Sequence, residues 1–397
     1  MREREGGIDS AKGQGKMSFS IKEKELIAFT RKLLRIPSPS GKEKEIARVM
    51  AAEMRAAGFE CVKVDDLFNV TGVLKGKNPH FRLLLNGHLD HAEAGSMKDP
   101  YSGKILEREG RKVIWGRGAC DMKGAVAAML FAAKAVKDSG VKLKSSIILT
   151  AVSLEEAGRG EGIKRLLKRE KIRADMAISG EATNLQINLG HRGKLEFDVL
   201  AKGKTTHGST PSLGINAIFQ MKKFIEKLES AYALPVDPFF GPCTVTAIDI
   251  SASPGRLTPI VPDRCNLVVD RRYLPSESAG SVKKELEKLI AEVRSEDPRF
   301  EGEVALAKDF PPYYCDPGEE VVKLLQGARR KVLGEVGKFQ AWRFGVDGTF
   351  IHRAGIPCAG FGPGNEDLAH TPEDYVPVDD LILAAKVYAQ AIVDACG

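Results

Sequence analysis

No stretch of the 397-residue sequence approaches the roughly 18 uninterrupted apolar residues that a membrane-spanning helix requires. The chain also lacks a C-x-x-C pair, because its seven cysteines are scattered along it. Their odd number and wide spacing argue against a disulfide framework and a zinc finger, and they favour a reducing cytosol. We therefore expect a cytoplasmic protein without a membrane-bound part.

The sequence also lacks a block of charge of one sign. Its formal net charge is +7, but basic and acidic residues alternate in segments such as KRLLKREKIRADM and KKELEKLIAEV. This interleaving is typical of solvated helix faces and not of a nucleic-acid-binding surface. We expect no nucleic acid among the partners.

The N-terminal segment MREREGGIDSAKGQGK has no apolar core, so it is not a secretory signal. We expect residues 1–19 to form an unstructured tail, and translation starting at Met17 is an alternative to a start at Met1. The remaining length exceeds one ordinary hydrophobic core, which predicts two domains.

From about residue 20, helical patterns alternate with short apolar runs. The segment KEKEIARVMAAEMRAAGF has apolar residues at helical spacing, whereas FRLLLNG, SSIILTAVS, ADMAISG and IPCAGFG are typical of buried strands. This alternation predicts an α/β domain with a mostly parallel sheet and helices on both faces. We assign residues 20–190 and 303–397 to it.

The pattern changes after Gly190. The segment KLEFDVLAKG alternates with period two, so Leu195, Phe197 and Val199 should face a core while their neighbours face water. A helix near 215–231, two strand patterns and a second helix follow. We predict that residues 191–302 form an inserted α+β domain with a four-stranded antiparallel sheet and two helices.

Polar side chains that can bind a metal follow four of the buried strands and one glycine-rich segment. In parallel sheets such side chains meet beyond the carboxyl ends of the strands. The candidates are His88 and Asp90 in NGHLD, Asp121 in GRGACDMKG, Glu155 and Glu156 in SLEEAG, Glu181 in SGEAT, and His370 in AHTPEDY.

This set of imidazoles and carboxylates suits two divalent metals, for which zinc is the expected ion and cobalt or manganese could substitute. A bridging role is expected for Asp121. Asp90 is placed to accept the second imidazole N–H of His88. Of the adjacent glutamates, we assign Glu156 as a ligand and Glu155 as the general base.

Taken in order, these motifs resemble those of the co-catalytic zinc amidohydrolases and peptidases that include acetylornithine deacetylase, succinyl-diaminopimelate desuccinylase, aminoacylase and glutamate carboxypeptidase. The resemblance covers residues 20–395 and also includes HGSTPSLGINAI. The segments GIPCAGFGPGNEDLAHTPEDYVPVDDL and VVDRRYLPSE are most similar to an uncharacterised branch linked to selenium metabolism.

The resemblance implies a ligand set for each metal, with His88 and Glu181 on one ion, Glu156 and His370 on the other, and Asp121 between them. It also implies that the inserted domain is a lid through which two subunits dimerise. His207 matches a lid histidine that stabilises an oxyanion in the partner subunit's site.

Three positions depart from the family pattern. Pro259 stands where many relatives carry an asparagine that helps bind the substrate. Val346 and Thr349 replace the serine and arginine of the desuccinylase segment. The desuccinylase substrate therefore does not transfer, and Arg192, Arg271 and Arg272 are the candidates for binding a substrate carboxylate.

The sequence thus predicts a metal-dependent hydrolase that cleaves the amide bond of an N-acyl amino acid or a related small molecule. A dipeptidase or carboxypeptidase acting on short peptides is one alternative. A non-catalytic, metal-stabilised binding protein is another, although it would not need a spare base at Glu155. A thiol nucleophile at Cys120 is a further alternative.

Overall fold

A computed structural model describes residues 19–230, 234–255 and 258–397, and the predicted tail therefore lies outside the described residues except for Phe19. The chain divides into two compact units. Unit 1 comprises residues 1–189, 315–340 and 350–397, and unit 2 comprises residues 190–314 and 341–349. No helix within the described ranges has the length and apolar character needed to span a bilayer.

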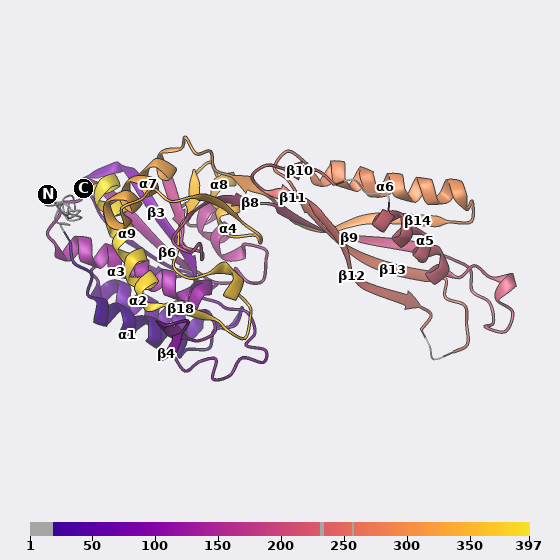
Figure 1. Cartoon of the computed structure of the whole chain (residues 1–397), viewed down its shortest axis with the longest axis horizontal. Coiled ribbons are helices and arrows are strands. Elements are labelled where there is room, and N and C mark those ends of the chain that lie inside the picture. The colour runs from indigo at the N-terminus through magenta and orange to yellow at the C-terminus, as the bar shows by residue number, and fades with distance from the viewer. Residues whose placement is uncertain (1–18, 231–233, 256–257) are drawn as a thin grey trace, which may run out of the picture. The chain divides into compact units, whose positions relative to one another are not determined.

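Unit 1 is built on a central sheet in the strand order β1-β2-β6-β3-β7-β17-β8 (Figure 1). The four strands β6, β3, β7 and β17 are parallel to one another. The bounds of the strands are β1 Glu60–Val64, β2 Val70–Leu74, β3 Asn78–His88, β6 Ser145–Val152, β7 Met176–Ser179, β8 Ile187–His191 and β17 Cys358–Gly360. A second, three-stranded sheet contains β4 Lys104–Arg108, β5 Arg111–Trp115 and β18 Tyr375–Pro377.

Helices cover the two faces of the central sheet. They are α1 Glu23–Leu34, α2 Lys44–Ala56, α3 Gly124–Asp138, α4 Glu161–Lys168, α7 Glu320–Leu333 and α9 Val378–Cys396, and α8 Gly348–Arg353 lies at the boundary of the unit. Because β6 is buried along its whole length and α3 is rich in alanine, the helix packs closely on the strand and both become core. The predicted α/β fold is confirmed.

Unit 2 holds an antiparallel sheet in the order β12-β13-β9-β14. The strands are β9 Gly193–Lys202, β12 Thr244–Ser253, β13 Arg264–Tyr273 and β14 Glu301–Phe310. Buried and partly exposed residues alternate along β9, and Leu195, Phe197 and Val199 are fully buried as predicted. These residues pack on α5 (Ala217–Ser230) and α6 (Ala279–Glu296), which gives the expected sheet with two helices.

Unit 2 is longer than the predicted segment 191–302. The reason is that β14, which begins at Glu301, is the fourth strand of the sheet and pairs with β9 along its length. The short strands β10 Val236–Asp237, β11 Gly241–Pro242 and β15 Tyr313–Tyr314 also belong to this unit, and β16 Phe339–Trp342 lies at its boundary.

Candidate metal centre

The four parallel strands of unit 1 place the candidate ligands at one edge of the sheet. His88 is the last residue of β3, Glu155 and Glu156 follow β6, and Glu181 follows β7. His370 comes after β17 and a 3₁₀ turn at Glu366–Leu368. Because these strands are neighbours and run in the same direction, the side chains that follow them converge, as the sequence predicts.

Asp121 enters the same place from a different element, a π-helical turn at Ala119–Lys123 that precedes α3. Its carboxylate belongs to two groups of side chains. Within each group, the ligand atoms all lie within 4.8 Å of one another. The first group contains His88 and Glu181, and the second contains Glu156 and His370. One carboxylate shared by two groups is the arrangement expected for a pair of bridged cations.

The distances show how closely the groups approach. His88 Nε2 lies 2.9 Å from Asp121 Oδ1 and 3.5 Å from Glu181 Oε1. His370 Nε2 lies 3.3 Å from Asp121 Oδ2 and 2.7 Å from Glu156 Oε2. His88, Asp121 and Glu181 are buried, whereas the His370 side chain is 56% exposed.

Three buried or nearly buried carboxylates facing two imidazoles create a strongly negative environment. Hydrogen bonds to Asp121 and Glu156 raise the pKa of His370 to about 10, although burial opposes this shift. Burial would raise the pKa of Asp121, but hydrogen bonds from His370 and His88 outweigh it and lower that pKa. Carboxylates that stay charged beside imidazoles that attract positive charge fit divalent cations, and the mixed nitrogen and oxygen donors suit zinc, cobalt or manganese.

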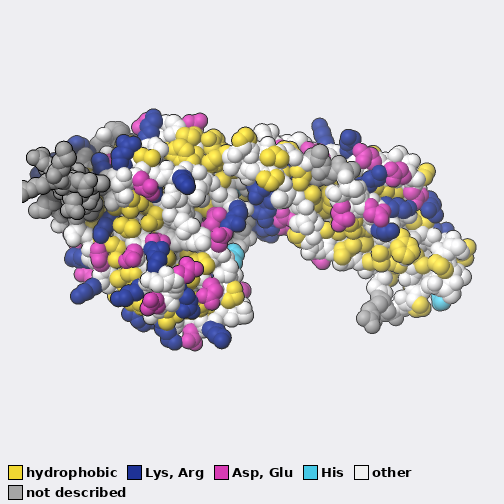
Figure 2. Space-filling model, in the orientation of Figure 1, with side chains coloured by type: hydrophobic (Ala, Val, Ile, Leu, Met, Phe, Trp, Pro, Cys, Tyr) yellow, Lys and Arg dark blue, Asp and Glu magenta, His cyan; other side chains and the backbone are white. Residues whose placement is uncertain are grey.

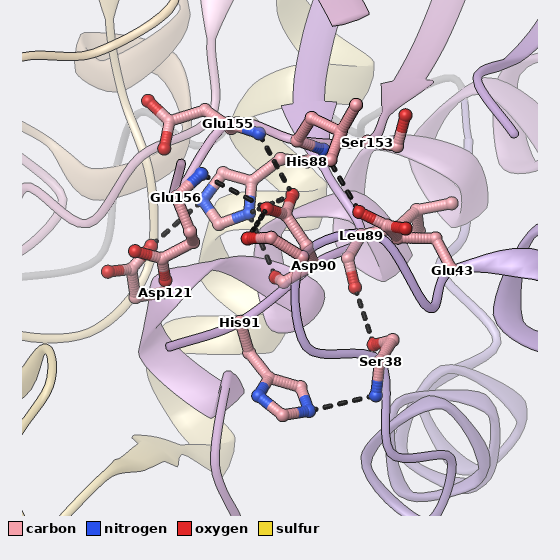
Figure 3. Close-up of polar contacts among 12 residues, drawn as sticks. Ser38, Glu43, His88, Leu89, Asp90, His91, Asp121, Ser153, Glu155 and Glu156 are labelled. Atoms are coloured by element: carbon pink, nitrogen blue, oxygen red, sulfur yellow. Dashed lines mark hydrogen bonds and ion pairs between the residues drawn. The ribbon is translucent and has the colours of Figure 1, made fainter. Parts of the chain in front are cut away.

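The predicted role of Asp90, to accept the second imidazole N–H of His88, stays a prediction. The Nδ1 atom of His88 lies 3.0 Å from the backbone carbonyl oxygen of Asp90, whereas the nearer carboxylate oxygen is 3.6 Å away. The carboxylate accepts the backbone N–H groups of Glu155 and Glu156, at 3.2 and 3.0 Å (Figure 3). Both the backbone carbonyl and the carboxylate of Asp90 thus lie near the Nδ1 atom of His88, where an acceptor would favour the tautomer with a proton on Nδ1.

Glu155 belongs to neither group of ligand atoms. Burial opposes a raised pKa of His88, but Glu181, Asp121 and, with the smallest effect, Glu155 outweigh it and raise that pKa. The backbone of Glu155 is buried, and the residue is 9% exposed. Among the adjacent glutamates, the structure thus separates Glu156, which contacts His370, from Glu155.

Cys120 does not fit the role of a nucleophile. Its side chain is fully buried, and burial raises the pKa of the thiol well above its ordinary value, with Asp374 and Asp121 adding to the effect. A reactive thiol needs the opposite environment.

Asp374 is a functional residue that the sequence reasoning missed. This fully buried carboxylate accepts the backbone N–H groups of Gly118 (2.6 Å) and Cys120 (3.0 Å), and Arg117 lies 3.3 Å away. It thereby fixes the turn that carries Asp121. Its position four residues after His370 in AHTPEDY is the only sequence signal that could have identified it.

Lys123 is a second buried residue that the sequence did not indicate. Its ammonium group donates to the carbonyl oxygen of Leu33 in the last turn of α1 (3.5 Å) and to that of Ile36 just after the helix (3.0 Å). Burial lowers the pKa of Lys123 to about 7. This contact attaches the far end of the same turn to α1.

His207 lies in unit 2, where it is exposed. Its Nδ1 atom lies 2.6 Å from Ser209 Oγ, and a β-bridge joins its backbone to Ile260. The neighbouring Gly208 N–H donates to the carbonyl of Pro259 at 2.6 Å. The departure at Pro259 thus removes a side-chain donor but keeps the backbone pairing.

The arginine candidates of unit 2 already have partners. Arg271 is fully buried and lies 2.8 Å from Glu277, and Arg272 lies 2.9 Å from Asp270. Arg192 donates to the backbone carbonyl of Pro242. Of the three, Arg271 is the one whose full burial keeps its guanidinium away from solvent, whereas Arg192 and Arg272 are partly exposed.

The other two departures contact one histidine. His191 Nε2 accepts the backbone N–H of Val346 at 3.2 Å and lies 3.1 Å from the hydroxyl of Thr349. Thr349 also donates to the carbonyl of Pro311. At these positions the chain has a buried hydrogen-bond network within unit 2.

Comparisons with known proteins agree with the fold. A model described as peptidase family M20/M25/M40 matches residues 84–394. The uncharacterised protein YgeY of Escherichia coli K12 is 31% identical over 92% of this chain and 93% of its own length. An acetylornithine deacetylase of Myxococcus xanthus is 29% identical over 87% and 90%.

Solved structures share the fold. The aminopeptidase PepT of Bacillus cereus superposes with a TM-score of 0.77 at 21% identity, over 94% of this chain and 99% of its own. A Bacillus subtilis protein, YXEP, described as a dinuclear metal-binding peptidase of family M20, superposes with a TM-score of 0.73 at 16% identity, over 94% and 98%.

Proposed function

The chain belongs to peptidase family M20/M25/M40, and from this premise we propose that it is a two-metal hydrolase that releases an amine from the amide bond of an N-acyl amino acid or a related small molecule. The observation that carries the proposal is the Asp121 carboxylate, which contacts His88 with one oxygen and His370 with the other. The acetylornithine deacetylase among the relatives supports the substrate class.

In this proposal His88 and Glu181 hold one cation, Glu156 and His370 hold the other, and Asp121 bridges them. When bound, such cations polarise an amide carbonyl and lower the pKa of a water molecule. Zinc is the proposed ion, with cobalt or manganese as substitutes. The dinuclear centre named for the Bacillus subtilis protein is consistent with this assignment.

Glu155 has the role of general base. It would accept the proton of the attacking water and deliver it to the departing nitrogen. The hydrogen bond from its backbone N–H to Asp90, which places it beside the ligand groups, supports this role. A binding protein without catalysis would gain nothing from such a carboxylate.

We further propose that two copies of the chain dimerise through unit 2 and that His207 donates to the oxyanion in the partner's site. Strand β12 is an edge of the antiparallel sheet, and on it Ile248 and Ile250 are 51% and 52% exposed. Hydrophobic side chains gather on this part of unit 2 (Figure 2). An exposed apolar edge strand is suited to pairing with a second copy of itself.

The test is the release of free amine from N-acetyl, N-succinyl and N-carbamoyl amino acids and from dipeptides. Zinc- or cobalt-loaded wild type is compared with Glu155→Gln and with Glu161→Gln, an exposed glutamate on α4 that serves as a matched control. Wild type and Glu161→Gln should be active, and Glu155→Gln should lose about 100-fold to 10,000-fold.

Cleavage of dipeptides alone would favour a dipeptidase or carboxypeptidase. Equal activity of Glu155→Gln would exclude the assigned base. If the wild type, with two metals bound per chain, released no amine from any substrate of the panel, this would contradict the amide-hydrolase proposal and favour a binding role.

A further inference from the structure

The segment after β6, residues 153–156, is held by side chains instead of by a neighbouring strand. We call it the base loop because it carries Glu155. Each of its four consecutive backbone N–H groups donates to a buried side chain from another part of the chain. The pairs are Ser153 with Asn69 Oδ1 (2.9 Å), Leu154 with Glu43 Oε1 (3.1 Å), Glu155 with Asp90 Oδ1 (3.2 Å) and Glu156 with Asp90 Oδ2 (3.0 Å).

The middle of the base loop has an unfavourable backbone conformation. Leu154 has a φ of 58°, which lies in the left-handed region that residues other than glycine rarely adopt. Such a conformation persists only where the surroundings enforce it, and it often occurs next to a functional group. It turns the chain immediately before Glu155, and the side chain that binds the N–H of Leu154 is Glu43.

The buried carboxylate of Glu43 accepts few hydrogen bonds besides the one from Leu154. It is fully buried, its Oε1 also accepts the N–H of Gly41 at 2.9 Å, and its Oε2 has no hydrogen-bond partner among the described residues. Burial of a carboxylate is costly unless its hydrogen bonds compensate, and here it raises the pKa of Glu43.

Helix capping does not account for this residue. Glu43 is at the N-cap position of α2, where a side chain would ordinarily accept an N–H group of the first helical turn. Its side chain makes no such bond. It extends toward the base loop instead, as Figure 3 shows.

The segment that contains Glu43 also contacts the ligand side of the site. Ser40 Oγ donates to Asp90 Oδ2 at 2.7 Å, and Ser38 Oγ donates to the carbonyl of Leu89 at 2.8 Å. One short segment, residues 38–43, therefore contacts both the residues that follow His88 and the base loop. Its position sets the distance between the metal ligands and the base.

We propose that Glu43 is a positioning residue for Glu155: its carboxylate binds the N–H of Leu154 and holds the base loop in the turn that directs the general base. The inference rests on the proposed function of Glu155. It adds a residue that touches neither substrate nor metal and acts through the backbone of the loop.

The test compares Glu43→Met, which removes the acceptor at similar volume, with Glu43→Gln, which keeps an acceptor oxygen. Glu45→Met, an exposed glutamate two residues later on α2, is the matched control. The first measurement is hydrogen–deuterium exchange of the peptide that contains residues 153–156, in the metal-loaded full chain. Glu43→Met should exchange at least about tenfold faster there, and Glu45→Met and Glu43→Gln should resemble wild type.

The second measurement is steady-state kinetics on a substrate that the wild type cleaves. With both metal sites saturated, because the base loop also carries the ligand Glu156, Glu43→Met should lower kcat by about 10- to 100-fold with KM unchanged, since a misplaced base slows the chemical step and not binding. In a Glu155→Gln background the same substitution should have no further effect on kcat, since the group that it positions is gone.

Unchanged exchange of residues 153–156 in Glu43→Met would overturn the proposal, and so would a loosened loop with wild-type kcat. Additive effects of Glu43→Met and Glu155→Gln would also contradict it. Should Glu43→Met fail to fold, Glu43→Asp takes its place. It keeps the charge but shortens the side chain by one methylene, so that the carboxylate no longer reaches the N–H of Leu154, and the same results are expected. Absence of any cleaved substrate would refute the proposed function, whereas the exchange measurement would still decide whether Glu43 holds the loop.

Discussion

The side chain of Asp90 binds the backbone of Glu155: the Oδ1 atom of Asp90 accepts the N–H of Glu155 at 3.2 Å. The same carboxylate accepts the N–H of Glu156 at 3.0 Å. One fully buried side chain thus connects the end of β3, which carries a metal-ligand candidate, to the loop that carries the proposed base. The base and the ligands are therefore parts of one hydrogen-bonded framework.

Asp121 should be required for both cations. Asp121→Asn removes the shared anionic ligand and should reduce bound zinc from two ions per chain to fewer than one, whereas His370→Ala should leave about one ion on His88, Glu181 and Asp121. Metal analysis of the purified variants measures this. His207→Asn is the control and should keep two ions, because His207 belongs to neither ligand group. Full metal content in Asp121→Asn would contradict the bridging assignment.

Asp374 should control metal affinity without touching a metal. Asp374→Asn replaces one acceptor oxygen by an amide group that faces the N–H of Gly118 or Cys120, so the turn that carries Asp121 should loosen. Loss of such an outer hydrogen bond typically weakens metal binding by about 10- to 100-fold. Competition with a chromophoric chelator measures the affinity. Glu373→Gln, an exposed neighbour, should be without effect, and equal affinities in the two variants would refute this role.

His191 should make the stability of unit 2 depend on pH. Burial lowers the pKa of His191 to about 4, and its contacts fit a neutral ring, with Nδ1–H donating to the carbonyl of Arg192. The unfolded histidine binds a proton below pH 6.5, whereas the folded one does not until about pH 4. Stability is therefore full above pH 6.5 and falls between pH 6.5 and 4, by up to about 3 kcal/mol.

Urea unfolding followed at several pH values between 4 and 7 measures this dependence. In His191→Gln, which keeps polar groups but does not titrate, the slope between these pH values should be smaller than in wild type. An identical slope in the two proteins would show that other groups cause the dependence.

The edge strand β12 should determine the oligomeric state. Ile250→Lys places a charge on the exposed apolar edge and should convert a dimer to a monomer. Light scattering coupled to size-exclusion chromatography measures the mass. Glu287→Lys on the outer face of α6 is the control and should leave the mass unchanged. A monomeric wild type would refute dimerisation, as would a dimeric Ile250→Lys.

Three features could be predicted from the sequence: the alternation of strands and helices, the period-two strand at Leu195, Phe197 and Val199, and the convergence of the candidate ligands. These features are local, or follow from the rule that parallel strands end at one edge of a sheet. His88, Glu156 and Glu181 could be proposed as ligands because such side chains are unusual at or just after the ends of buried strands, and His370 because it follows the glycine-rich segment after such a strand.

The acceptor that each backbone N–H group of the base loop binds could not be predicted from the sequence, because it depends on how distant segments pack. Asp90 is two residues from His88, yet its carboxylate binds the backbone 65 and 66 residues further on. No local pattern marks the hydrogen bonds of Glu43 and Asn69 to the base loop, because a buried loop takes its hydrogen-bond partners from whichever distant segments pack against it. Sequence periodicity specifies which face of an element is buried, but the partners of irregular backbone are set by packing between segments far apart in the chain.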